Sequence, residues 1–594
     1  MFLGFRRNET LALLAGVFVL AAAAPASADD LSLDLPVFGH STFSMTSTTT
    51  LRYRGQNYNT LPANPFDDDF ASIQQRFDLA LQGDELRLEV RLDTFIPFAF
   101  DETVVFNGRS LTRPAWFGSA AGCPEVSSSL CYLAWDVRPE RMVLRWDHES
   151  WSVELGDAQL VIGRGAALSF RKVDLLAVDT ALRGAHVRYD DGHFRARIHA
   201  GVANPQNQDS ITLGVFQDPL DIFAAGSIGA TFGPDDAFVV SGHAVRAWFE
   251  NADPSMGSMP TGRAVDVLGW TMEAPALADG HLALYAEANG MRRSETPDLG
   301  GNEVYRYGRS VYASAQLQLD NLTVLVEWKD YRNFLVAPSP TEGALHRVYS
   351  AAPTLEFDGP QRLRALGNQR GGSIRIDYGF APGPWQVSAN GSVYGLSEDP
   401  LRDPWDDILV AHGWLTLQRR LEYNQGLNWS LSASAGFREE SVIQPTAGTI
   451  FRAGDTDRQM AHGMVDLTLG EGEHSFDIVV DHRFELHRLD GTSLTEYQVG
   501  GASVTYSNGV RFAATLALRW SNFIPQEAVL RDAQDYNFLG GDMYPSIELR
   551  WNFDPGTFIR GFFGSTPGGV VCSGGVCRPV PSYEGALLQL VVRI

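Results

Sequence analysis

The feature that most constrains the fold is a two-residue alternation of side-chain character that recurs along the chain. In the stretch 86–93, Leu or Val at every second position alternates with Arg, Glu, Arg and Asp. Successive side chains of a β-strand point to opposite faces, so this period predicts a strand with one charged face. The same pattern recurs at 373–380, 510–521 and 546–553. We therefore expect an all-β protein.

Turn signals separate the alternating runs at regular intervals. Eleven short turns rich in Gly, Asp, Asn and Pro lie at 83–84, 147–149, 191–192, 233–235, 279–280, 320–321, 382–384, 424–426, 471–472, 508–509 and 555–556. Longer polar loops lie between the hairpins, at 55–69, 96–137, 204–224, 250–262, 335–370, 396–404, 442–456, 523–541 and 569–581. Eleven hairpins, with a first strand at 41–54 and a last at 583–594, predict about 24 strands, within a range of 22–26.

This arrangement predicts a transmembrane antiparallel up-and-down β-barrel, with short periplasmic turns and long extracellular loops. A barrel of this size is too wide for side chains to fill, so a polar, wet lumen is expected inside and lipid outside. Closure also pairs every backbone polar group, as the lipid requires. A soluble β-propeller or β-helix is the alternative, although no motif of 40–50 residues repeats.

The N-terminal segment indicates export. Residues 1–28 have a charged start, an apolar core and a small-residue end, which is the pattern of a secretory signal peptide. The alternative is a membrane anchor, for which the apolar run is short. Residues 29–40 are then a periplasmic N-terminal segment and residues 41–594 the barrel, and the expected location is the bacterial outer membrane.

The four cysteines form two local pairs, Cys123 with Cys131 and Cys572 with Cys577. In an exported chain such pairs predict two disulfides that constrain loops. A metal site is the alternative, although metal ligands are usually spaced more closely with further Cys or His.

Composition excludes several classes of function. The net charge of −24 argues against a nucleic-acid partner, and 44% hydrophobic residues argue against a disordered chain. No Gly-x-Ser-x-Gly motif is present and the 13 His are scattered, so we expect no enzyme, no catalytic residues and no cofactor. The run Asp67–Asp69 is a candidate Ca²⁺ ligand group, but a solvated acidic loop is the favoured interpretation, so no metal site is expected.

The candidate site is the polar face of the strands. Eleven charged residues are expected to face the lumen: Arg87, Glu89, Arg91, Asp93, Arg375, Asp377, Arg511, Arg519, Glu548, Arg550 and Arg593. Facing Arg and carboxylate side chains create a transverse field that orients polar solutes. The alternative interpretation is that these side chains pair with one another and stiffen the wall.

Over residues 41–594 the chain resembles the Gram-negative outer-membrane β-barrel proteins, porin-like in the broad sense. One stretch, 156–192, has a Gly-Asp opening, a Gly163-Arg164-Gly165 strand and a returning Leu-Arg-Gly strand, and is similar to a segment of poorly characterised outer-membrane barrels. Residues 324–334 and 353–356 are similar to segments of the same class of outer-membrane barrels. The resemblance implies the class of protein and names no substrate.

These observations favour a channel or exporter for polar solutes, with a wet lumen narrowed by the inward folding of loops 96–137 and 335–370. The alternative is a plugged barrel that serves as a receptor or structural platform for a partner complex. The expected partners are outer-membrane lipid and lipopolysaccharide, a small polar solute, and in the second case a protein.

Overall fold

The computed structural model describes residues 31–35, 39–56, 70–99, 103–106, 109–112, 138–173, 176, 178–206, 220–233, 237–249, 264–294, 305–336, 348–351, 353–356, 367–380, 383–397, 399, 402–422, 427–443, 454–488, 494–522, 543–573, 576–580 and 583–593. The signal peptide at 1–28, the acidic run Asp67–Asp69 and the pair Cys123 and Cys131 lie outside these residues. They stay predictions.

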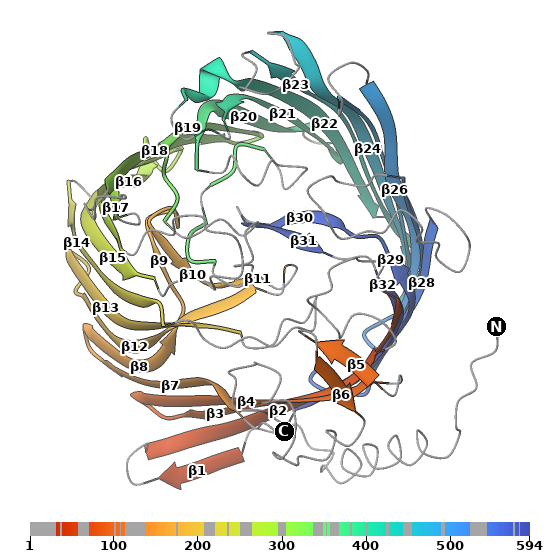
Figure 1. Cartoon of the computed structure of the whole chain (residues 1–594), viewed down its shortest axis with the longest axis horizontal. Helices are drawn as coiled ribbons and strands as arrows, with labels where there is room; N and C mark the ends of the chain where they lie inside the picture. The colour runs from red at the N-terminus through yellow and green to blue at the C-terminus, as the bar shows by residue number, and fades with distance from the viewer. Residues whose placement is uncertain are drawn as a thin grey trace.

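The wall of the molecule is a closed antiparallel barrel of 24 strands (Figure 1). The main sheet contains 26 strands, but β1 (Leu31–Leu35) and β11 (Lys172–Val173) each pair with only one wall strand. The first wall strand, β2, pairs with the last, β32, from Thr46 opposite Arg593 to Gln56 opposite Glu584. This pairing closes the ring, and the predicted strand number is confirmed.

The first twelve wall strands are β2 (Gly39–Gln56), β3 (Phe70–Gln82), β4 (Leu86–Ala99), β7 (Arg138–His148), β8 (Trp151–Ala158), β12 (Val178–Asp190), β13 (Phe194–Pro205), β14 (Ile222–Phe232), β15 (Phe238–Trp248), β16 (Ala264–Leu277), β17 (Leu282–Ser294) and β18 (Tyr305–Leu319). The other twelve are β19 (Leu322–Arg332), β20 (Gln369–Phe380), β21 (Trp385–Leu396), β22 (Ile408–Glu422), β23 (Leu427–Val442), β24 (Asp455–Glu471), β25 (His474–Arg488), β26 (Leu494–Asn508), β27 (Phe512–Ser521), β28 (Met543–Asn552), β29 (Phe558–Thr566) and β32 (Tyr583–Arg593).

Eight of the eleven predicted turns lie entirely within the described residues, and each joins two consecutive strands that pair. The turns at 233–235, 382–384 and 424–426 lie partly or wholly outside the described residues, and the strands that flank each of them also pair, so the predicted asymmetry of the two ends is confirmed. We call them the short-turn end and the long-loop end. Three short hairpins or strand pairs belong to the long connections: β5 (Thr103–Phe106) with β6 (Arg109–Thr112), β9 (Leu160–Ile162) with β10 (Leu168–Phe170), and β30 (Gly569–Ser573) with β31 (Val576–Val580). A 3-10 turn, η7 (Pro404–Asp406), precedes β22.

The outer face of the wall is apolar and exposed. Leu268 on β16 is 72% exposed and Phe563 on β29 is 64% exposed, and Ile198 and Leu516 are similarly open. Apolar side chains in contact with water are unfavourable over so large a surface, whereas lipid is their natural environment. A closed barrel with an apolar outer band is the architecture of outer-membrane proteins. The chain is located in the outer membrane.

No helix among the described residues is long and apolar enough to cross a membrane.

The inner face differs from the expected uniform polar lining. In Figure 1 the strands β9, β10 and β11 are drawn inside the ring, next to β12–β19. Over this arc the inward-facing side chains include Phe223, Val245 and Val267, which are buried in one apolar cluster with β9 and β10. The prediction of a wet, polar inner face is therefore wrong for this arc, because a second layer of chain covers the wall.

Two local expectations are also corrected. Gly163-Arg164-Gly165 was expected within a strand, but it forms the turn between β9 and β10, where Gly163 and Gly165 have φ of +60° and +92°. Arg511 was expected on a strand face, but it belongs to the turn between β26 and β27. In both places the sequence alternates like a strand, but a glycine at positive φ turns the backbone: Gly163 and Gly165 in the first case and Gly509 in the second.

Candidate functional site

Two segments lie against the inner wall and define the candidate site. We call residues 160–170, which contain β9 and β10, the inner hairpin. We call residues 348–351 and 353–356 the inner strap, which belongs to the long connection between β19 and β20. Both segments come from the long-loop end, since they connect strands at that end of the barrel.

The inner hairpin is held by apolar packing. Leu168 and Phe170 are completely buried, and the Phe170 ring meets Phe223 of β14 edge-on at 5.0 Å between centroids. Tyr349 of the strap completes this group, with its ring 5.2 Å from Phe170. Each such buried side chain contributes about 1.5–3 kcal/mol of hydrophobic stabilisation. The hairpin is therefore a packed layer of the fold.

The tip of the inner hairpin binds a carboxylate of the wall. The Arg164 backbone N–H donates to Glu287 Oε2 at 2.8 Å, and Tyr285 Oη donates to the same oxygen at 2.7 Å. Asn289 donates to Glu287 Oε1 at 2.8 Å. A Cβ on Gly163 would overlap this carboxylate, so any larger residue there would have to displace Glu287 from its hydrogen bonds. A buried carboxylate needs such donors, and the turn supplies one of them.

The inner strap lies along the hairpin. Ser169 N–H donates to the Tyr349 carbonyl at 2.8 Å, and Ala351 N–H donates to the Gly165 carbonyl at 2.9 Å. The Tyr349 hydroxyl donates to the buried carboxylate of Asp221 at 2.9 Å. These bonds satisfy backbone groups that packing would otherwise leave unpaired. The strap and the hairpin therefore form one continuous inner layer.

Glu356 connects the far end of the strap to three wall strands. Its carboxylate accepts from Arg438 Nε of β23 at 3.1 Å and pairs with His412 Nδ1 of β22 at 2.8 Å. Tyr394 of β21 donates to the other oxygen. Burial by itself would raise the pKa of the Glu356 carboxyl, but the Arg438 guanidinium, with the His412 and Tyr394 hydrogen bonds, lowers it to about 2.

The charge pairing continues along the inner wall beyond the strap. Arg438 also pairs with Glu440 on the same strand. Glu485 of β25 is fully buried and binds Arg458 at 2.5 Å and His487 Nε2 at 2.6 Å. Buried charges of this kind persist only when they are paired and hydrogen-bonded, so this part of the wall is rigid by construction.

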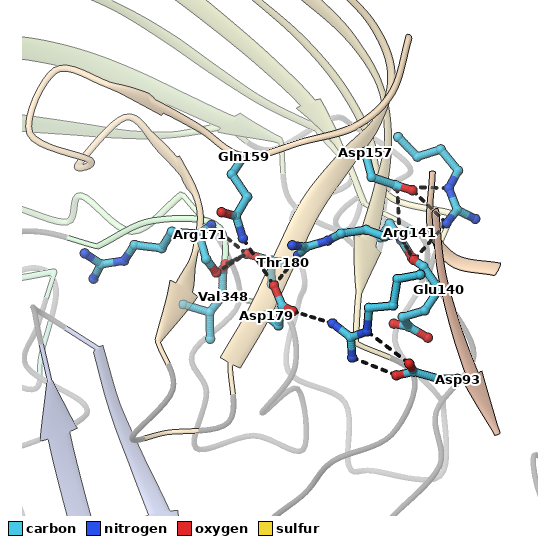
Figure 2. Close-up of polar contacts among 12 residues, drawn as sticks. Asp93, Glu140, Arg141, Asp157, Gln159, Arg171, Asp179, Thr180 and Val348 are labelled. Atoms are coloured by element: carbon cyan, nitrogen blue, oxygen red, sulfur yellow. Dashed lines mark hydrogen bonds and ion pairs between the residues drawn. The ribbon is translucent and has the colours of Figure 1, made fainter. Parts of the chain in front are cut away.

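Asp179 joins the start of β12 to two distant wall strands. Figure 2 shows Asp179 between Gln159 and Arg141, and Gln159 Nε2 donates to it at 3.2 Å. Arg91 Nη1 of β4 donates to Asp179 Oδ2 at 2.9 Å and also pairs with Asp93 at 2.7 Å. The base of the inner hairpin is thereby fixed to β4 and β7.

The predicted lumen residues divide into a buried and an exposed group. Arg91 and Asp93 come together in the buried contact with Asp179. The others make local contacts: Arg87 with Glu89, Arg375 with Asp377 at 2.8 Å, Arg519 with Asp481 at 2.8 Å, Glu548 with Arg560 at 2.7 Å, and Arg550 with Asn552 at 2.9 Å. Arg593 lies beside Gly556, the glycine of the turn between β28 and β29. Their role in passage stays a prediction.

On the opposite arc of the wall, charged pairs of the inner face remain partly exposed. Arg519 of β27, whose neighbour Leu518 faces outward, points inward and pairs with Asp481 of β25. The Arg519 side chain is 49% exposed. Glu548 and Arg560 are also partly exposed. Charged pairs of the inner wall are buried where they support docked chain, as with Glu356 and Arg438, and exposed elsewhere, as with Arg519 and Asp481, so the lining of the interior is uneven.

The sequence contained signals for part of this site. The Gly163-Arg164-Gly165 turn and residues 353–356 both belong to stretches that the resemblance singled out. Glu287, Asp179 and Arg438 carried no signal, because a single Glu, Asp or Arg on an alternating strand looks like any other wall residue. Their partners are 123, 88 and 82 residues away in the chain.

The described residues include one of the two predicted cysteine pairs, Cys572 and Cys577. The backbone register places Cys572 directly opposite Cys577 in the β30–β31 hairpin, and the disulfide stays a prediction. Among the residues that the structure describes, no group of three or more His, Cys, Asp and Glu could hold a metal ion.

Neither a family model nor a curated protein matches the chain. Among solved structures, the translocation pore of the P pilus usher PapC is 10% identical, with a TM-score of 0.38, over 93% of this chain and 99% of that one. The siderophore receptor PirA from Pseudomonas aeruginosa (8% identity, TM-score 0.41) and the copper transporter OprC (13%, TM-score 0.40) each cover 93% of this chain and 80% of their own. Nothing about function is transferred at such low similarity.

The barrel wall and the chain packed inside it indicate the broad class of function. Large outer-membrane barrels are either water-filled channels or barrels plugged from within. A closed 24-strand wall with chain packed inside it is therefore a barrel channel or receptor.

Proposed function

We propose that this protein is an outer-membrane channel or exporter for polar solutes, whose passage is narrowed by the inner hairpin and the inner strap. On this proposal the protein is not an enzyme. The single observation behind it is the uneven lining of the inner wall. Chain is docked on the arc from β12 to β23, whereas the pairs Arg519–Asp481 and Arg560–Glu548 of β25 and β27–β29 remain partly exposed.

The exposed pairs support a wet passage. Half-exposed charged side chains such as Arg519 and Asp481 require water around them, since transfer of a charge to an apolar medium is strongly unfavourable. Rows of opposite charge in a water-filled lumen create a transverse field that favours polar and charged solutes over apolar ones.

Conductance of the purified chain in planar bilayers tests the proposal. The wild-type protein should conduct ions, and a variant without residues 340–368, which include the strap, should conduct more. A variant with Gly472→Ala, in the open turn between β24 and β25, is the control and should conduct like the wild type. Absence of conductance in both the wild type and the deletion variant would exclude a channel.

The second candidate is a plugged barrel that acts as a receptor or platform. It is favoured by one observation, the burial of the contacts that hold the strap, with Glu356, Arg438 and Glu440 almost inaccessible to solvent. Such a protein should show negligible conductance and should retain a specific protein partner from the periplasm or the cell surface.

A further inference from the structure

Three charged residues form a continuous row on the outside of the barrel, close to the long-loop end. Arg246 of β15, Asp266 of β16 and Arg292 of β17 lie directly opposite one another across the strands. We call them the arginine row. Each is two residues from the end of its strand at the long-loop side, where β15 and β17 end and β16 begins.

The arginine row points away from the lumen. Val245 and Ala247, which flank Arg246, both belong to the buried inner cluster, so Arg246 between them faces outward. Val265 and Val267 place Asp266 outward in the same way. The row is therefore on the lipid side of the wall.

The row lies at the edge of the apolar band. Leu268, the next outward residue on β16 after Asp266, is 72% exposed, and Trp270 follows it. Two residues along a strand span roughly 7 Å. The change from a fully apolar surface to guanidinium groups over this distance marks the boundary between acyl chains and lipid headgroups.

The chemistry of the row suits a phosphate group. Arg292 Nη2 lies 2.6 Å from Asp266 Oδ2 and Arg246 Nε lies 3.5 Å from Oδ1, so one carboxylate is shared by two guanidinium groups. The trio keeps one net positive charge, and both Arg side chains are about half exposed. A phosphate oxygen is the ligand that a partly neutralised Arg pair binds through its remaining N–H groups.

Aromatic rings hold the two guanidinium groups in place. Arg246 lies over the Trp248 ring at 4.8 Å and Arg292 over the Tyr305 ring at 5.3 Å. Stacking on a ring face fixes a planar guanidinium while its N–H edge stays directed outward. This reduces the entropy lost when a ligand binds.

We propose that the arginine row is a binding site for a phosphorylated lipid headgroup of the leaflet at the long-loop end. The phosphate bridges Arg246 and Arg292 while the acyl chains cover Leu268 and the apolar band below. The adjacent outward group, Arg309, Asp330, Arg332 and Asp403, extends the charged surface but carries no net charge. The arginine row is therefore the centre of the site.

The test measures binding of bisphosphorylated lipid A, and of the same lipid without phosphates, to the full chain in detergent micelles by native mass spectrometry. The wild-type protein should prefer the phosphorylated lipid. The double variant R246Q/R292Q should lose on the order of a hundredfold in affinity for it, since two charge-assisted hydrogen bonds are removed. The double variant R246K/R292K keeps the charge but loses the planar groups that stack on Trp248 and Tyr305, so its affinity should be intermediate.

Arg419 provides the matched control. It also faces outward and stacks on aromatic rings, Trp385 at 4.6 Å and Trp429 at 5.2 Å, but it lies at the short-turn end. R419Q should bind the phosphorylated lipid like the wild type. D266N should bind it more tightly, because both guanidinium groups lose their internal partner.

Equal binding of the two lipids by the wild type, or unchanged binding by R246Q/R292Q, would overturn the proposal. A merely structural role of the row would make D266N weaken binding instead of strengthening it. The heat-dependent shift of the folded barrel on electrophoresis confirms that each variant is folded, so that a loss of binding is not a loss of structure.

Discussion

Glu356 of the inner strap and Arg438 of β23 form a buried ion pair, in which Arg438 Nε lies 3.1 Å from Glu356 Oε2. Both side chains are almost inaccessible to solvent, and they are 82 residues apart in the chain. The pair links a loop segment to the barrel wall. It therefore determines whether the strap stays inside the barrel.

Replacement of Glu356 by Gln should release the strap. The variant leaves Arg438 with Glu440 as its remaining carboxylate partner, and loss of one member of a buried pair costs on the order of 3 kcal/mol. Hydrogen exchange of the strap peptides should become faster, and bilayer conductance should rise. Glu548→Gln, which removes an exposed carboxylate paired with Arg560, should change strap exchange very little.

The strap should respond to acid only at very low pH. The pKa of Glu356 is lowered from 4.5 to about 2, so its ionised form stabilises the docked strap fully above about pH 4.5. This stabilisation decreases as the pH falls from there and is lost below about 2. The hydrogen-exchange protection of residues 348–356, measured relative to the intrinsic exchange rate at each pH, should therefore be unchanged between pH 7 and 5 and should fall towards pH 2. A transition centred near pH 4.5 would contradict the tight pairing with Arg438.

Gly163→Ala should dislodge the tip of the inner hairpin. The new methyl group would meet the Glu287 carboxylate at 2.4 Å, in addition to the strain of a φ of +60°. Gly472→Ala has the same strain, with a φ of +59°, but nothing within 4 Å of the new Cβ. Both variants lose about 1 kcal/mol from backbone strain. Any further loss of thermal stability in Gly163→Ala measures the contact with Glu287, and equal stability of the two variants would show that the tip is not docked.

Phe170→Ala should open a cavity in the inner layer. Phe170 is fully buried against Phe223 and Tyr349, and truncation of such a ring typically costs about 3–5 kcal/mol. Phe563→Ala removes the same ring from the lipid face of β29, where acyl chains can fill the space. Denaturant unfolding in lipid vesicles should show a clearly larger loss for Phe170→Ala. Equal losses would mean that the hairpin does not contribute to stability.

The class of fold, the strand number and the eleven turns could be predicted because all three depend on local signals. The two-residue alternation at 86–93 or 546–553 is enough to identify a strand, and a turn such as Asn508-Gly509 identifies its own hairpin. A short turn also restricts the register of the two strands that it joins.

The candidate site could be predicted only in fragments. Arg91 and Asp93 were recognisable as polar wall residues, but their partner Asp179 lies beyond two further wall strands, β7 and β8, and the inner hairpin. Phe223 and Val245 occupy inward positions where a polar residue was expected. They are apolar because the inner hairpin covers them, and nothing in a strand pattern shows that a distant loop will return to that face.

The sequence by itself determined that the chain is a closed β-barrel of about 24 strands with long connections at one end, because alternation and turn chemistry act between neighbouring residues. Only the tertiary structure decided how the interior is occupied. Contacts such as Arg164 with Glu287, or Glu356 with Arg438, join residues 123 and 82 positions apart. They exist because barrel closure brings these residues to one surface, where burial selects the pairs that satisfy one another's hydrogen bonds and charges.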